Sequence, residues 1–166
     1  MKDLPYKNKI NPKIKALILI LSLFIIGIII GQVISNIAIV YLKEVIENLD
    51  INIGNEVKNR LISGYKWLVT LIVIDIILLG SLLWIYFNTY RKTKSGFIIG
   101  LNFFIIILLV KSVLSLAYLF SFFNESIKLL PGAIITLGTY GFGVIGFFIN
   151  IFEIIAISIL LYLSME

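Results

Sequence analysis

The sequence FIIGLNFFIIILLVKSVLSLAYLFSFF, residues 97–123, is long and apolar enough to cross a bilayer as one helix. A membrane span needs about 20 mostly apolar residues, because each helical residue rises about 1.5 Å and the hydrocarbon core is about 30 Å thick. Lys111 lies near the middle of this stretch. Since a charge there costs about 2.5–3.5 kcal/mol on insertion scales, we expect Lys111 to face protein or water and to have a partner.

Three other apolar stretches are long enough to span, at about 16–42, 67–90 and 137–163. Together with 97–123 they predict an all-α, polytopic membrane protein, an up-down bundle of four transmembrane helices. The bundle forms a single domain over residues 16–166. Repeated glycines near residue 140 leave the start of the last span open between Ala133 and Gly141.

The composition places the chain in lipid and excludes several kinds of chemistry. Of 166 residues, 60% are hydrophobic and 14% are charged, whereas soluble domains have roughly half apolar and about a quarter charged residues. The chain has no cysteine and no histidine, which excludes disulfides, thiolate or imidazole metal sites and the commonest general base. We therefore expect no enzyme activity, no metal and no cofactor, and membrane lipids as one partner.

Basic residues in short segments predict the orientation in the membrane. The net charge is +5, and the tail 1–15 has five lysines against one acid. The turn at 91–94 is also basic, while the segment 43–66 is nearly balanced by acids. The positive-inside rule then predicts a multi-pass cell-membrane protein with both termini cytoplasmic and 43–66 and 124–132 outside. Because the basic residues flank spans, we expect no nucleic-acid partner.

The segment 43–66 is the only sizeable polar stretch between spans. Its apolar residues recur at helical spacing on either side of Gly54, which predicts two short amphipathic helices in an extracytoplasmic loop. They are expected to lie on the membrane surface or to cap the bundle, and a surface for docking a partner is the alternative.

The first span carries two polar or small-residue patterns. Gly27, Gly31 and Ser35 recur every four residues, the spacing that lets two helix backbones approach closely. Gln32 and Asn36, also four apart, place two amides on a neighbouring face. Helix packing with amide hydrogen bonds is the favoured interpretation, and a face that lines a solute path is the alternative.

Three ionisable residues within spans, Asp75, Lys111 and Glu153, predict an intramembrane polar cluster. If the last span begins near Gly141, Glu153 lies at the depth of Lys111; a start at Ala133 would place it near the inner edge instead. Residues expected to share the cluster or to pack the helices around it are Ser115, Tyr118, Gln32, Asn36, Asn150, Gly143 and Gly146.

Two interpretations of the cluster follow. In the first, Lys111 pairs with a carboxylate and fixes the helix register. In the second, the surplus carboxyl binds a proton or cation, or the polar face lines a solute path. The sequence therefore favours a non-catalytic membrane subunit or scaffold that packs against other membrane proteins or a second copy. A small oligomeric transporter or channel subunit is the alternative.

The frequent Ile, Lys and Asn residues favour an AT-rich prokaryotic source.

Overall fold

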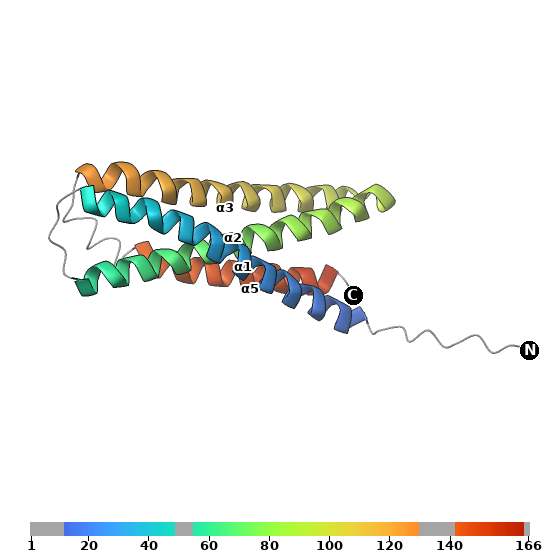
Figure 1. Ribbon diagram of the computed structural model, residues 1–166. Helices are drawn as coiled ribbons and strands as arrows, with labels where there is room; N and C mark the ends of the chain where they lie inside the picture. The colour runs from blue at the N-terminus through green and yellow to red at the C-terminus, as the bar shows by residue number, and fades with distance from the viewer. Residues whose placement is uncertain (1–11, 49–54, 130–141, 165–166) are drawn as a thin grey trace, which may run out of the picture.

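The computed structural model describes residues 12–48, 55–129 and 142–164, and all of these except the turn 94–95 are helical. The helices are α1 (Pro12–Asn48), α2 (Asn55–Thr93), α3 (Gly96–Leu129) and α5 (Phe142–Ser164) (Figure 1). Each contains a stretch apolar and long enough to cross a membrane: Ile14–Val40, Ile62–Thr93, Gly96–Phe120 and Gly146–Ser164. An all-helical protein with four such helices is therefore confirmed.

The second helix is the centre of the bundle. In the most apolar 18-residue stretch of α2, 50% of the residues are buried. The corresponding share is 11% in α1 and 17% in each of α3 and α5. α1 crosses α2, and α3 and α5 lie on opposite sides of this crossing pair (Figure 1). Among the described residues, α3 and α5 each pack on α2, but their backbones do not approach each other. The helices α3 and α5 are thus joined mainly through α2.

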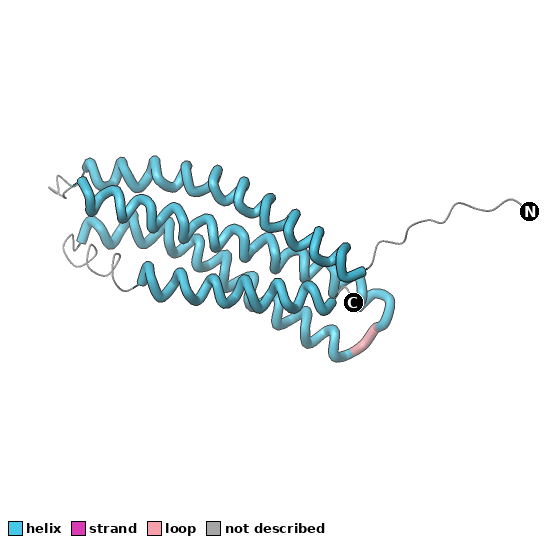
Figure 2. Tube along the Cα trace, turned by 90° about the horizontal axis from the view of Figure 1, so that it is seen from below, coloured by secondary structure: helices cyan, strands magenta, loops and turns pink. Residues whose placement is uncertain are grey.

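The four helices run roughly along one axis, with the ends of the described chain at the same end of the bundle. The start of α1, the end of α5 and the turn between α2 and α3 lie at that end (Figure 2). This alternation of direction follows from apolar spans joined in sequence, because each helix must return across the same layer.

Within its described residues, 43–48 and 55–66, the polar segment does not form helices separate from the spans, which differs from the sequence-based expectation. α1 continues to Asn48 and α2 already begins at Asn55, so the described parts of the segment extend these two helices. At 37 and 39 residues, the helices are about 55–60 Å long, well beyond the hydrocarbon thickness. An amphipathic extension and a separate amphipathic helix have the same residue periodicity, so the sequence pattern alone could not distinguish them.

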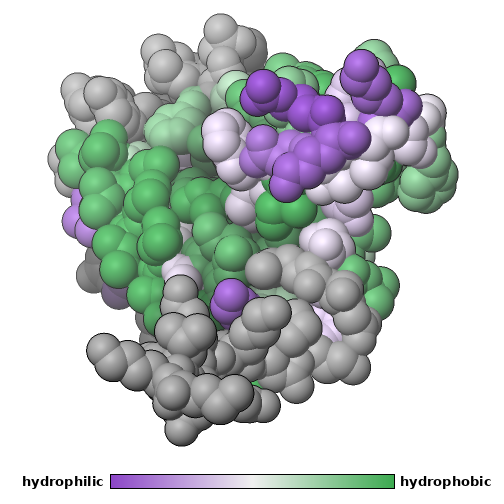
Figure 3. Space-filling model, turned by 90° about the vertical axis from the view of Figure 1, so that its right-hand side faces the viewer, coloured by the Kyte–Doolittle hydropathy of each residue, from purple (hydrophilic) through white to green (hydrophobic). Residues whose placement is uncertain are grey.

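The turn between α2 and α3 consists of Lys94 and Ser95. Lys94 adopts a positive φ of 50°, and its N–H donates to the Tyr90 carbonyl at 2.8 Å. A left-handed residue with this hydrogen bond is a common way for a helix to end, and α2 ends here. Arg91 and Lys92 lie in the last turn of α2, where positive charge interacts favourably with the helix dipole. Seen from this end of the bundle, hydrophilic side chains gather at one corner, and most of the other coloured side chains in the view are hydrophobic (Figure 3).

Small residues allow α1 to lie close to α2. Gly27, Gly31, Ser35 and Ala38 are all buried, at the spacing of one helix face. A Cβ added at Gly27 would fall 2.9 Å from Ile74 Cγ1 and 3.2 Å from Ile74 Cα. The regularly spaced small residues of the first span therefore lie at its contact with the central helix.

Candidate functional site

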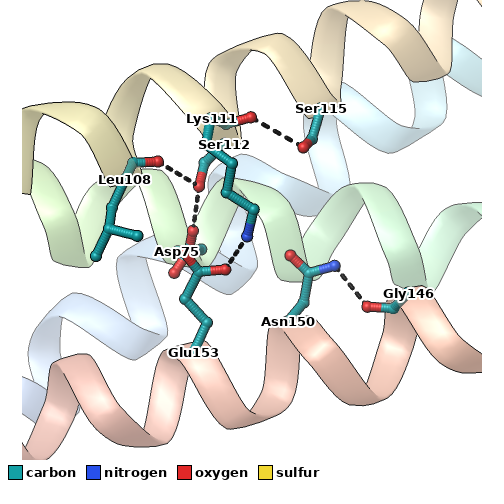
Figure 4. Close-up of polar contacts among 8 residues, drawn as sticks. All are labelled: Asp75, Leu108, Lys111, Ser112, Ser115, Gly146, Asn150 and Glu153. Carbon is teal, nitrogen blue, oxygen red and sulfur yellow. Dashed lines mark hydrogen bonds and ion pairs between the residues drawn. The ribbon is translucent and has the colours of Figure 1, made fainter.

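The polar site is built around an ion pair between α3 and α5. Lys111 Nζ donates to Glu153 Oε2 and forms a salt bridge with it (Figure 4). Lys111 lies near the middle of the span Gly96–Phe120. Because the α3 and α5 backbones do not approach each other within the described chain, two long side chains are required to connect them.

The ion pair is unevenly exposed. The Lys111 side chain is 43% exposed, whereas that of Glu153 is only 11% exposed. Glu153 therefore lies inside the bundle, and Lys111 reaches in from its outer surface. This places a positively charged side chain of the described chain at the surface that faces lipid or another protein, at mid-span.

A second polar contact lies deeper, between α2 and α3. Asp75 is 0% exposed and Ser112 is 2% exposed. Ser112 Oγ lies 2.5 Å from Asp75 Oδ2 and 3.1 Å from the carbonyl oxygen of Leu108 on its own helix (Figure 4). Asp75 was expected in the cluster, but Ser112 was not, although a hydroxyl next to an in-span lysine is a signal that could have identified it.

Several buried oxygens at or near this site have no hydrogen-bond partner among the described residues. They are Oδ1 of Asp75, Oε1 of Glu153 and Oδ1 of Asn102 on α3. A buried polar atom without a partner costs about 1–3 kcal/mol, so such atoms need a physical explanation. Asp75, Glu153 and Lys111 together carry one surplus negative charge if all three are ionised.

Two other residues expected in the cluster, Ser115 and Asn150, form hydrogen bonds within their own helices. Ser115 Oγ donates to the Lys111 carbonyl at 2.9 Å, and Asn150 Nδ2 donates to the Gly146 carbonyl at 2.7 Å. Both bonds are within one helix, as the close-up shows (Figure 4). Tyr118 is 59% exposed on α3.

The two amides of α1 are not part of the described cluster. The Gln32 side chain is partly buried and that of Asn36 is exposed. Neither side chain makes a hydrogen bond to another residue of the described ranges. The Gln32 backbone carbonyl accepts a bond from Ser35 Oγ at 3.0 Å. Of the expected cluster, the structure brings Asp75, Lys111 and Glu153 close to one another.

The surroundings of Gly146 on α5 are described, whereas those of Gly143 are not. A Cβ at Gly146 would lie 3.7 Å from Leu68 Cδ1, an ordinary van der Waals distance, so α5 packs on α2 there with room for a methyl group. Gly143 is the second residue of α5, and its surroundings lie outside the described contacts. Its expected packing role stays a prediction.

The chemistry available at this site is that of one ammonium, two carboxyls and one hydroxyl. No group of three His, Cys, Asp or Glu side chains that could hold a metal ion occurs within residues 12–48, 55–129 and 142–164. An apolar groove lies elsewhere, between Phe24 of α1 and the α5 residues Ile155, Ile159 and Tyr162. The polar cluster is thus suited to binding a proton or a small cation, or to forming polar contacts between helices.

Comparison with known proteins adds a family but no activity. No curated protein and no solved structure matches this chain. A family described as "Family of unknown function (DUF8036)" matches residues 66–165. The matched segment contains most of α2 and all of α3 and α5, and with them the polar cluster, whereas α1 lies outside it. The chain therefore belongs to this family of unknown function, DUF8036.

Proposed function

We propose that this protein is a non-catalytic subunit of the cell membrane that works by packing against other membrane proteins, with both termini in the cytoplasm. The observation that supports the proposal best is the position of Lys111. Its side chain is 43% exposed near the middle of an apolar span. An isolated bundle would leave part of this charged residue against hydrocarbon, at a cost that a covering helix would remove.

The surface around Lys111 has the pattern of a helix contact. Ile107, Lys111 and Leu114 follow one another at i, i+4 and i+7 on α3, and we call them the Lys111 face. Ile107 is 64% exposed and Leu114 is 62% exposed. This combination of two large apolar side chains with one charge between them suits a second transmembrane helix better than it suits lipid alone.

The chemistry of Lys111 specifies the partner. A lysine ammonium has three donor hydrogens, and among the described residues Lys111 Nζ donates to Glu153. The proposed partner is a transmembrane helix of another protein that presents a hydrogen-bond acceptor, either a side-chain amide, a hydroxyl or a carboxylate, at the depth of Lys111. Hydrogen bonds of this kind contribute about 0.6–2 kcal/mol in membranes.

Photocrosslinking in native membranes tests this proposal. A photoreactive residue at Leu114 should give a discrete adduct with another membrane protein, and the adduct should weaken when Lys111→Met is added. Ile29 on α1, which is 59% exposed, is the matched control position. Identical adducts from Leu114 and Ile29 would contradict the proposal. An adduct between two copies of the chain alone would assign the Lys111 face to self-assembly instead.

A small oligomeric transporter or channel subunit is the second candidate. The observation in its favour is that one oxygen each of Asp75 and Glu153 is buried without a partner among the described residues. Proton or cation flux into liposomes that disappears in Glu153→Gln would support it. Flux that is unchanged in both Glu153→Gln and Lys111→Met would show that the cluster is not part of a transport path.

A further inference from the structure

We propose that Asp75 is a proton-binding site, and that the carboxyl of this residue holds a proton on Oδ2 and donates it to Ser112 Oγ. In this arrangement Ser112 in turn donates to the carbonyl oxygen of Leu108. The inference stands independently of the proposed subunit role, because it concerns the buried contact between α2 and α3 and not the Lys111 face.

The hydrogen-bond count at Ser112 is the first argument. A serine hydroxyl has one hydrogen to donate and two lone pairs that accept. Ser112 Oγ nevertheless lies 2.5 Å from Asp75 Oδ2 and 3.1 Å from the Leu108 carbonyl, and a carboxylate and a carbonyl are both acceptors. One hydrogen cannot make a full bond to each. If Asp75 supplies a proton, both contacts become ordinary hydrogen bonds with one donor and one acceptor.

The surrounding charges are the second argument. The charged groups near Asp75 in the described structure are Lys111 of α3 and Glu153 of α5. Lys111 already pairs with Glu153. On α1 no acidic or basic residue occurs between Lys15 and Lys43, so this helix brings no counter-charge. An ionised Asp75 would therefore have no cation of its own, whereas a protonated Asp75 leaves the cluster neutral.

Burial is the third argument. The Asp75 side chain is fully buried, and its Oδ1 has no partner in the described part of the chain. Leaving a charged oxygen in this state costs more than leaving the carbonyl oxygen of a neutral acid in it. A proton is the one ligand that removes the charge without needing any further space.

Release of the proton has a defined local consequence. When Asp75 Oδ2 gives up its proton, the cluster gains one negative charge, and the Ser112 hydroxyl turns from the Leu108 carbonyl to Asp75 Oδ2. The backbone is not disrupted, because a helical carbonyl already accepts the N–H four residues later. The direction in which the Ser112 hydroxyl donates its hydrogen bond thus depends on the protonation state of Asp75.

Infrared spectroscopy of the full chain in lipid nanodiscs tests the proposal without altering Asp75. The chain has only three aspartates, Asp3, Asp50 and Asp75. In the variant Asp3→Asn/Asp50→Asn, aspartate labelled with carbon-13 at the side-chain carboxyl reports on Asp75 alone. We expect the band of a protonated carboxylic C=O at neutral pH, and we expect it to move to higher frequency when Ser112→Ala removes the acceptor.

Two controls make the outcome decisive. The double variant Lys111→Met/Glu153→Gln removes the ion pair without freeing a cation beside Asp75, so it should leave the labelled band in place. Exchange of sodium for a large organic cation should not change the intensity of the band. A spectrum with only carboxylate bands at neutral pH would overturn the proposal. A protonated band that falls as sodium is added would overturn it as well, because the site would then bind a metal cation in place of a proton.

Discussion

Gly31 of α1 lies directly against the backbone of Thr70 of α2. A Cβ at Gly31 would fall 3.0 Å from Thr70 Cα and 3.2 Å from the Thr70 carbonyl oxygen. Neither atom can move away by a side-chain rotation. The distance between the first helix and the central helix therefore depends on the absence of a side chain at this position.

Gly31→Ala is expected to lower the free energy of unfolding. The added methyl group forces α1 away from α2, and overpacking of this kind costs about 1–3 kcal/mol. The greater helix propensity of alanine offsets up to about 1 kcal/mol of that. Unfolding of the purified protein in mixed micelles, followed by circular dichroism as denaturing detergent is added, measures the difference.

Gly80→Ala is the matched control for that change. Gly80 is also inside a helix, but nothing lies within 4 Å of an added Cβ. Alanine there should raise the free energy of unfolding by about 0.5–1 kcal/mol, through helix propensity alone. Changes of the same sign and size in both variants would show that α1 does not approach α2 at Gly31.

Ser112→Ala is expected to destabilise the protein, because it leaves the buried Asp75 carboxyl without its hydrogen-bond partner. The cost of such a loss is about 1–3 kcal/mol. Ser115→Ala on the same helix is the control. The Ser115 hydroxyl bonds only to the Lys111 carbonyl within the described ranges, so its loss should change stability by less than about 0.5 kcal/mol. Equal effects would contradict a special role for Ser112.

The sequence predicted four helices long and apolar enough to cross a membrane, because lipid imposes a length and an apolar composition that are visible without any packing information. It did not predict where helices end outside the membrane. The residues after Lys43 can continue a helix or form a new one with the same periodicity, and α1 in fact reaches Asn48. A helix end of this kind depends on contacts of the polar segment, which composition does not reveal.

The polar site was predictable in its charges and not in its geometry. Ionisable residues are rare in spans, so Asp75, Lys111 and Glu153 stood out by themselves. The face of α3 that packs on α2 could not be identified from the sequence, because almost every residue of this helix is apolar. A shift of one residue rotates a helix by about 100°. The buried hydroxyl is therefore Ser112, whereas the expected Ser115 lies on a more exposed side.

The ion pair between Lys111 and Glu153 is expected to show strong energetic coupling. Lys111→Met removes the cation and leaves a mostly buried carboxyl without its partner, and Glu153→Gln leaves a charged lysine within the span. The double variant removes both charges. It should be more stable than the sum of the two single effects predicts, by about 1–3 kcal/mol in a double-mutant cycle. Additive effects would show that the two side chains do not interact in the folded protein.

Lys94→Gly is expected to stabilise the turn between α2 and α3. Lys94 has a φ of 50°, a conformation that costs an L-residue with a side chain about 1 kcal/mol and that glycine adopts freely. The control Lys92→Gly removes the same charge inside the last turn of α2, where glycine costs about 1 kcal/mol. The two variants should therefore shift the unfolding midpoint in opposite directions. A shift in the same direction would show that loss of the lysine charge, and not the backbone conformation, determines the change in stability.

The proposed orientation makes a prediction about the two ends of α2. The natural chain has no cysteine, so single cysteines introduced at Asn59 and Thr93 can be labelled without background. Both side chains are exposed, and they lie on opposite sides of the apolar part of the helix. With cytoplasmic termini, a membrane-impermeant thiol reagent should label Asn59→Cys in intact cells and Thr93→Cys only after permeabilisation. The reverse pattern would mean that the basic turn faces outward, which the bias of lysine and arginine toward the cytoplasm opposes.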